Sequence, residues 1–116
     1  MYRIFLVEDD EVIAGAIADG LTRWGFEPYI CNDFQNVTEE FLACDPHLTL
    51  LDISLPFYNG YHWCSEIREI RKISKTPIMF ISSADDDMNI IMAINMGGDD
   101  FVAKPFEMQV LLTKIQ

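Results

Sequence analysis

Four short apolar runs in the sequence each end at residues that can bind a metal ion or a phosphate. The polar residues that follow these runs are Glu8-Asp9-Asp10, Asp52, Ser82-Ser83 and Lys104. Acidic side chains that converge on one place repel each other, and a hard cation with oxygen ligands, such as Mg²⁺, relieves that repulsion. An acid that stays partly uncoordinated can act as a nucleophile, while a lysine and a hydroxyl can receive phosphoryl oxygens. The combination predicts magnesium-dependent phosphoryl chemistry.

The acidic group at residues 8–10 also has an interpretation that needs no ligand. Acidic residues just after a strand are typical of a helix N-terminus, where they interact favourably with the helix dipole. A ligand site explains more of the sequence, because three other apolar runs also end in polar residues. Parallel strands bring their carboxyl ends to one edge of a sheet. We therefore expect Glu8, Asp9, Asp52, Ser82 and Lys104 to meet in one crevice.

The apolar runs have the composition of buried parallel strands. Residues 4–7 are all apolar, which is typical of a strand covered on both faces. A helix is expected next, because Ile13, Ile17, Leu21 and Trp24 recur at helical spacing and Gly25 follows as a stop signal. A strand followed by an amphipathic helix is half of a βαβ unit.

The same alternation continues to the end of the chain. Further strands are expected at 28–31, 48–51, 78–81 and 101–103, and further helices at 37–43, 63–70, from Asp85-Asp86-Asp87 to Gly97-Gly98, and from Glu107 onward. This order predicts an α/β fold with a doubly wound, five-stranded parallel sheet over residues 1–116. The last helix has no stop signal before Gln116, so we expect one domain excised from a longer protein.

Composition excludes several classes of protein. The chain has 116 residues, of which 50% are hydrophobic, and a net charge of -11, so a phosphate backbone would repel it. No apolar stretch approaches the roughly 20 residues of a membrane span, and we expect a cytoplasmic protein. The three cysteines are scattered without a C-x-x-C pair, which predicts buried thiols rather than disulfides or a zinc site.

Several motifs together resemble the receiver domain of two-component response regulators. They are Leu6-Val7-Glu8-Asp9-Asp10, Leu51-Asp52 with Leu55-Pro56 and Gly60, Ser82-Ser83, and Lys104-Pro105-Phe106. They stand in the family's order and spacing over essentially the whole chain. The resemblance implies the (βα)5 flavodoxin-like receiver fold, and it implies that Asp52 accepts a phosphoryl group from a sensor histidine kinase.

The resemblance also implies the metal ligands beside Asp52. Asp9 would bind Mg²⁺ directly, Glu8 would act through metal-bound water, and the main-chain carbonyl of Ser54 would complete the protein's share of the shell. The positive charge of Mg²⁺ and Lys104 would assist phosphoryl transfer, which depends on in-line positioning and charge neutralisation.

Two further residues take roles in the switch by the same resemblance. Ser82 would bond a phosphoryl oxygen, and Lys104 would pair with the phosphorylated aspartate; in the family its bond to Pro105 is usually cis. The hydroxyl residue then moves toward the phosphate, and an aromatic residue, here Phe101, turns inward. The face made by the fourth helix, fifth strand and fifth helix changes shape, and a homodimer is expected through it.

The segment from Asn89 to Phe106 is most similar to the OmpR-type subfamily, whose output is a winged-helix DNA-binding domain. It is also similar to regulators of cell-envelope and antimicrobial-peptide stress in Gram-positive bacteria. The resemblance implies contact with DNA only through a separate C-terminal output domain beyond residue 116, control of transcription, and no direct contact with the membrane.

The expected dimer face departs from the subfamily's usual charge pairs. Ile90, Met96 and Val110 stand where charged residues are common, although Asp99 or Asp100 with Lys114 would retain one pair. We expect a more apolar dimer face than usual, and therefore dimerisation that depends only weakly on salt.

Two other functions remain open. A phosphohydrolase of the haloacid-dehalogenase type also uses a strand-end aspartate and Mg²⁺, but it needs a second Asp two residues later, where this chain has Ser54. The other alternative is a receiver that dimerises without phosphorylation. The phosphorylatable receiver, a signalling acceptor rather than an enzyme, is the function that the residues favour.

Overall fold

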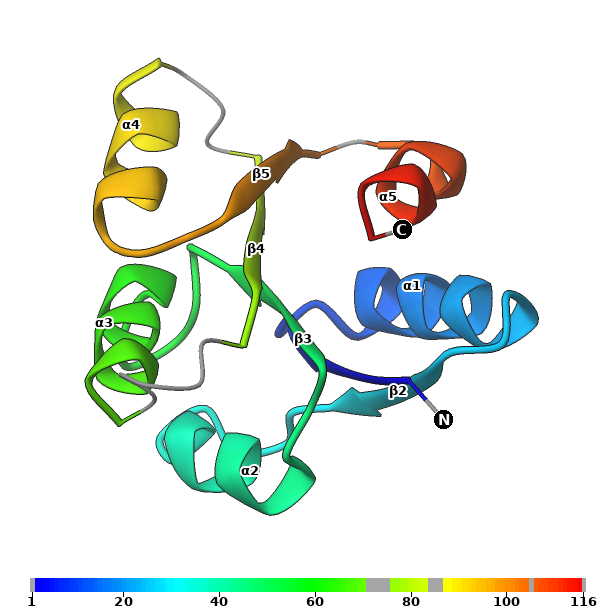
Figure 1. Ribbon diagram of the computed structural model, residues 1–116, viewed down its shortest axis with the longest axis horizontal. Coiled ribbons are helices and arrows are strands. Elements are labelled where there is room, and N and C mark those ends of the chain that lie inside the picture. The colour runs from blue at the N-terminus through cyan, green and yellow to red at the C-terminus, as the bar shows by residue number, and fades with distance from the viewer. Residues whose placement is uncertain (1, 71–75, 84–86, 105, 116) are drawn as a thin grey trace.

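The computed structural model describes residues 2–70, 76–83, 87–104 and 106–115, and it contains one sheet of five parallel strands. The strands are β1 (Arg3–Val7), β2 (Glu27–Ile30), β3 (Leu48–Asp52), β4 (Ile78–Ser82) and β5 (Asp100–Ala103). Their order across the sheet is β2-β1-β3-β4-β5 (Figure 1). The order reverses at β1, and the crevice between β1 and β3 is therefore the point where ligands bind in open α/β sheets.

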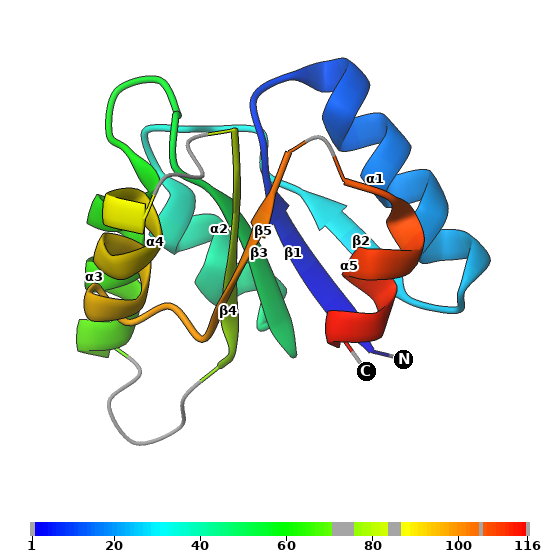
Figure 2. The same ribbon diagram turned by 90° about the horizontal axis from the view of Figure 1, so that it is seen from above.

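Helices cover both faces of the sheet. Figures 1 and 2 show α1 (Glu11–Arg23) and α5 (Met108–Ile115) on one face. The opposite face carries α2 (Val37–Cys44), α3 (Gly60–Ile70) and α4 (Asp87–Asn95). The predicted doubly wound α/β fold is confirmed.

Each face of the sheet has its own hydrophobic core. Phe5 and Val7 pack in the core beneath α2, α3 and α4, while Ile4 and Leu6 pack in the core beneath α1 and α5. This division follows from the strand geometry, because successive side chains point to opposite faces. Both faces are covered, so the buried part of the strand must be apolar at every position, as residues 4–7 of β1 are.

The helix expected after β1 is confirmed as α1, and its end agrees with the sequence: Trp24 is the C-cap, and Gly25 follows with a positive φ of 85°. Ile17 and Leu21 are buried, whereas Trp24 is 58% exposed because it lies just after the last helical residue. Gly20 is also buried, with Met108 of α5 packed over it.

The other elements match their predicted positions to within a few residues. Asp52 and Ser82 are the last residues of β3 and β4 rather than the first residues after them. The expected helix start at Asp85-Asp86 and the bond to Pro105 lie outside the described residues. Within the part of the chain that is described, no helix is long and apolar enough to span a bilayer.

Candidate functional site

The carboxyl ends of β1 and β3 bring three acidic side chains together. The register pairs Val7 with Leu51, so the residues that follow, Glu8 and Asp52, lie side by side at the edge of the sheet. Asp9 completes the group, and ligand oxygens of all three residues lie within 4.8 Å of one another. The predicted convergence of Glu8, Asp9 and Asp52 is confirmed.

These three carboxylates form a donor set that suits Mg²⁺. Glu8 and Asp52 are buried, while Asp9 is exposed. Hard divalent cations prefer carboxylate oxygens, and Mg²⁺ keeps part of its water shell when it binds proteins through one or two carboxylates. A site with two buried acids and one open side meets both requirements. The residues present therefore fit a magnesium ion.

Asp10 is excluded from this group by its role in α1. Its side chain accepts hydrogen bonds from the main-chain N–H groups of Val12 (3.0 Å) and Ile13 (3.2 Å). It is thus the N-cap residue of the helix. The two interpretations of residues 8–10 apply to different residues: Glu8 and Asp9 join the cluster, and Asp10 caps the helix.

Lys104 reaches the acidic cluster from the adjoining end of β5. Its Nζ donates a short hydrogen bond to Glu8 Oε1 and a second one to Asp52 Oδ2 at 3.2 Å. Its main-chain N–H donates to the carbonyl of Ser82 at 2.8 Å, which fixes the backbone at this point. The sequence predicts that Lys104 lies near Asp52, but no sequence pattern indicates its bond to Glu8.

Burial and charge act on this group together. Burial raises the pKa of Glu8, the hydrogen bond from Lys104 opposes that effect, and the nearby Asp52 charge adds to the increase, so the net change is upward. Burial alone would lower the pKa of Lys104, but its bonds to Glu8 and Asp52 outweigh burial and raise it. Lys104 is therefore held in its charged form, next to the acids that it neutralises.

Ser82 ends the strand next to β3, whereas Phe101 lies within β5, three residues before Lys104. Ser82 is fully buried and pairs in register with Ala103, the residue before Lys104. Phe101 is half-buried, lies opposite Phe80 in the neighbouring strand, and packs against the core beneath α4. A half-buried ring can change its degree of burial without breaking the sheet.

The loop after Asp52 is held tightly against β3. The Ser54 N–H lies 3.4 Å from Asp52 Oδ1, and the Gly60 N–H donates to the carbonyl of Ile53 at 2.9 Å. A Cβ atom on Gly60 would collide with the main-chain oxygen of Asp52. Glycine is therefore required here, because any side chain would displace the backbone that carries Asp52.

Arg68 makes a set of hydrogen bonds that the sequence does not predict. The Arg68 guanidinium donates to the carbonyls of Gly97 (2.9 Å) and Thr76 (2.6 Å) and to Asp99 Oδ2 (2.7 Å). Asp99 also accepts from the N–H of Ile78 at 2.8 Å. Asp99 is thus engaged within the chain, and Lys114 pairs instead with Asp100 at 3.1 Å. No local pattern reveals such bonds, because Arg68 and Asp99 lie far apart in the sequence.

Comparisons with known proteins agree with this architecture. Residues 4–116 match the family described as "Response regulator receiver domain". The chain is 47% identical over 116 residues to the uncharacterized transcriptional regulatory protein YvcP of Bacillus subtilis, covering 100% of this chain and 48% of YvcP. It is 42% identical to the sensory transduction protein BceR of the same species, again over 100% of this chain and 49% of BceR.

A solved structure gives the same result in three dimensions. The N-terminal domain of the nisin resistance regulator NsrR, a lantibiotic response regulator, superimposes with a TM-score of 0.86 at 42% identity, covering 99% of this chain and 95% of that one. The chain spans about half the length of the curated relatives it matches, at 48% of YvcP and 49% of BceR.

Proposed function

The chain belongs to the family of response regulator receiver domains, and on that premise we propose that Asp52 accepts a phosphoryl group in a reaction that needs Mg²⁺. The observation that carries this proposal is the group around Asp52, in which Glu8, Asp9 and Lys104 surround the end of β3. Receiver domains act through phosphorylation of an aspartate, and Asp52 is the buried acid that both the lysine and the metal-binding acids reach.

Transfer of the phosphoryl group from a phosphohistidine of a sensor kinase to Asp52 needs no general base. An oxygen of Asp52 forms a bond to phosphorus, the bond between phosphorus and the histidine nitrogen breaks, and the imidazole leaves with the electron pair. Glu8, Asp9, Asp52 and the main-chain carbonyl of Ser54 would hold Mg²⁺, which neutralises charge on the phosphoryl oxygens when bound.

We assign the other roles in phosphoryl binding and switching to Lys104, Ser82 and Phe101. Lys104 is positioned to exchange its bond to Asp52 for one to a phosphoryl oxygen, and the Ser82 hydroxyl would donate to another. Movement of Ser82 would make room for Phe101 to turn inward. Because Phe101 packs beneath α4, its movement would alter the surface made by α4, β5 and α5.

We propose that this surface forms a homodimer after phosphorylation. It exposes a group of large apolar side chains: Ile90, Ile91, Met92, Ile94 and Val110. All of them except Val110, which is on α5, belong to α4, and exposed apolar groups on one helix are typical of protein interfaces. The structure also supports a mostly apolar interface because Asp99 and Asp100 are already paired within the chain, with Arg68 and Lys114.

The whole protein is proposed to be a cytoplasmic transcription regulator. The matched relatives are about twice as long as this chain, and YvcP is described as a transcriptional regulatory protein. We infer that a C-terminal winged-helix domain supplies contact with DNA, that the chain itself touches neither DNA nor membrane, and that the pathway responds to antimicrobial peptides, as the description of NsrR indicates for that protein.

The phosphoacceptor is tested by chemical trapping. The protein is treated with phosphoramidate and Mg²⁺ and then with borohydride, which reduces an aspartyl phosphate to homoserine with loss of phosphate. We expect peptide mass analysis to find homoserine only at position 52, and none when a chelator replaces Mg²⁺. Homoserine at another position, or none despite intact fold, would contradict the assignment.

A further inference from the structure

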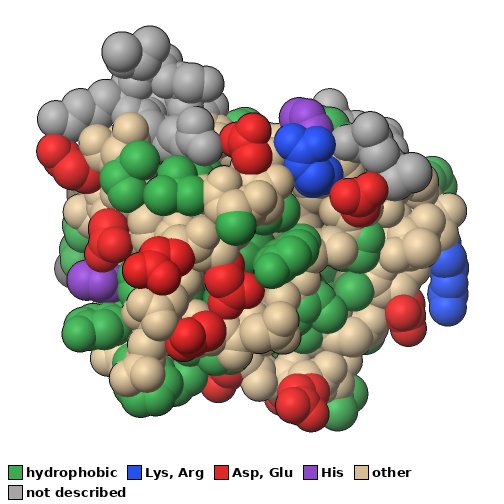
Figure 3. Space-filling model, turned by 90° about the horizontal axis from the view of Figure 1, so that it is seen from below, with side chains coloured by type: hydrophobic (Ala, Val, Ile, Leu, Met, Phe, Trp, Pro, Cys, Tyr) green, Lys and Arg blue, Asp and Glu red, His purple; other side chains and the backbone are tan. Residues whose placement is uncertain are grey.

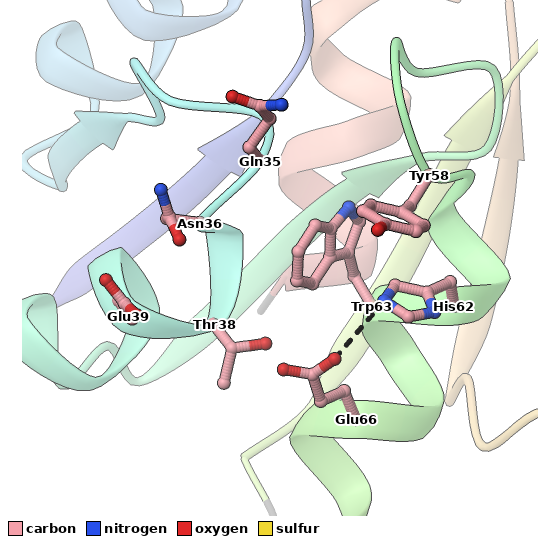
Figure 4. Close-up of a pocket in the computed structure, with 8 residues that line it drawn as sticks. All are labelled: Gln35, Asn36, Thr38, Glu39, Tyr58, His62, Trp63 and Glu66. Atoms are coloured by element: carbon pink, nitrogen blue, oxygen red, sulfur yellow. Dashed lines mark ion pairs between the residues drawn. The ribbon is translucent and has the colours of Figure 1, made fainter.

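A cleft of about 270 Å³ lies between the beginning of α2 and the beginning of α3, separate from the acidic cluster at Asp52. From α2 it is bordered by Thr38 and Glu39, and from α3 and the loop before it by Tyr58, His62, Trp63 and Glu66 (Figure 4). The proposed phosphoryl chemistry uses none of these residues.

Two buried polar groups in the wall of this cleft have no hydrogen-bond partner among the described residues. They are the Thr38 hydroxyl and the indole N–H of Trp63, whose residues are 5% and 3% exposed. Figure 4 shows the Thr38 hydroxyl pointing from α2 across the gap toward Glu66, and the Trp63 nitrogen lying beside Tyr58. Buried polar groups are normally paired, so these two groups indicate a ligand that offers both a donor and an acceptor.

Aromatic rings form one side of the cleft. Tyr58 stacks on His62 with ring centroids 4.4 Å apart and an interplanar angle of 20°. Trp63 meets both rings edge-on, at 5.6 Å from Tyr58 and 4.7 Å from His62. Tyr58 is half-exposed, so the outer part of this stack presents a flat surface to solvent. Such surfaces favour planar cationic groups.

Acidic side chains from both helices border the cleft, Glu39 from α2 and Glu66 from α3. Glu66 pairs with His62 at 3.2 Å, and Glu39 has no ion pair among the described residues. Figure 3 shows Asp and Glu side chains spread over the underside of the molecule as drawn in Figure 1, where α2 lies, with few Lys and Arg side chains among them. The net charge of the whole chain is -11, which raises the rate of encounter with a basic partner.

We propose that this cleft binds an arginine side chain presented by a partner protein. The guanidinium group is planar and carries five N–H donors, so it can stack on the exposed face of Tyr58 and donate to Glu66 and the Thr38 hydroxyl, while Glu39 adds negative charge at the border of the cleft. A main-chain carbonyl of the same partner segment accepts from the indole N–H of Trp63. A free metal ion or amine would leave that N–H without an acceptor, which favours a polypeptide.

The indole N–H signals of the two tryptophans provide the test. The protein is titrated with blocked Gly-Arg-Gly, and in parallel with blocked Gly-Lys-Gly and Gly-Gln-Gly, while proton–nitrogen correlation spectra are recorded. We expect Gly-Arg-Gly to shift the Trp63 signal saturably and to leave the signal of Trp24, which lies at the end of α1, unchanged. The lysine peptide should bind more weakly, and the glutamine peptide should cause no shift.

Variants separate recognition from general charge attraction. Glu39→Gln combined with Glu66→Gln should weaken binding of Gly-Arg-Gly about tenfold or more, whereas Asp19→Asn combined with Glu27→Gln, which removes the same charge elsewhere, should leave it unchanged. If the first pair disturbs folding, Thr38→Val, which keeps the side-chain shape, should also weaken binding. The proposal is overturned if Trp63 shows no saturable shift, if both tryptophans shift alike, or if both pairs of variants weaken binding equally.

This inference does not depend on the proposed function. Asp52→Asn should bind Gly-Arg-Gly as tightly as the unaltered protein. If the peptide does not bind, the proposed role of Asp52 is unaffected. If Asp52 is not phosphorylated, the proposed binding of arginine in the cleft is unaffected.

Discussion

At the scale of single residues, the balance of charge around Asp52 depends on Lys104. Glu8 and Asp52 are buried acids at the end of neighbouring strands, and Lys104 bonds to both. A buried charge without a partner is strongly unfavourable. Besides the role proposed for it with the phosphoryl group, Lys104 therefore stabilises the metal-free protein by neutralising these two acids.

Replacement of Lys104 tests this balance. In the absence of metal, Lys104→Met should lower the free energy of unfolding by about 2 kcal/mol, because two buried carboxylates lose their counter-charge. Lys114→Met is the matched control, since its pair with Asp100 is partly exposed, and its effect should stay below about 1 kcal/mol. Urea denaturation at neutral pH with a chelator measures both values, and added Mg²⁺ should reduce the difference. Equal losses in the two variants would contradict this account.

The cysteines differ in their expected reactivity. Burial and the hydrogen bond to Glu40 raise the pKa of Cys31 to about 12, and burial raises the pKa of Cys64 to about 11. The thiolate is the reactive form, so a raised pKa keeps both residues as unreactive thiols at pH 8. Cys44 is less buried, and iodoacetamide at pH 8 should therefore modify Cys44 first. Peptide mapping that found Cys31 or Cys64 modified first would show that these thiols are accessible.

At the scale of elements, the start of α3 determines where Asp52 lies. Gly60, the first residue of α3, packs on the main chain of Asp52 so closely that a Cβ atom has no room. The helix, the loop and Asp52 therefore form one unit, and we expect a change at Gly60 to displace Asp52.

Two glycine substitutions test this coupling. Gly60→Ala should destabilise the fold by roughly 1–3 kcal/mol through overpacking and should also slow phosphorylation of Asp52. Gly15→Ala is the control, because a Cβ atom there meets nothing within 4 Å, and it should stabilise α1 by about 0.5–1 kcal/mol. Thermal unfolding and phosphorylation rates measure the two effects. A Gly60→Ala protein that is stable and fully reactive would exclude the coupling.

The sequence predicts elements better than it predicts contacts between them. β1 and β3 are mostly apolar strands that lead into acids, and both their position and the convergence of Glu8, Asp9 and Asp52 follow from that pattern and from parallel topology. The bond from Lys104 to Glu8 does not follow, because it depends on the reach and rotamer of one side chain. The same is true of Arg68, whose bonds to the segment before β5 depend on how α3 and β5 pack.

At the scale of the whole molecule, the charge is strongly negative while the proposed dimer surface is apolar. The chain carries 19 acidic and 8 basic residues, so two copies repel each other at a distance. Association through the proposed surface would therefore rely on apolar contact at short range, for which α4 exposes Ile90, Ile91 and Ile94.

The proposed dimer is tested by variants on two faces. Ile94 on α4 is 47% exposed, and Val12 on α1 is 82% exposed. In phosphorylated protein, Ile94→Gln should weaken dimerisation about tenfold, and Val12→Gln should leave it unchanged, as measured by sedimentation velocity. Added salt should leave the dimer intact or strengthen it, because screening removes repulsion between two acidic chains. A dimer that dissociates steeply with salt would show that ion pairs hold it together.

The central claim is that Asp52 is a magnesium-dependent phosphoryl acceptor, and intact mass tests it most directly. The unaltered protein and the Asp52→Asn variant are incubated with phosphoramidate, each with Mg²⁺ and with a chelator. Their intact masses are then measured by mass spectrometry. The account predicts a single phosphoryl adduct that appears only in the unaltered protein with Mg²⁺. An adduct that persists in Asp52→Asn, or no adduct in any folded sample, would contradict it.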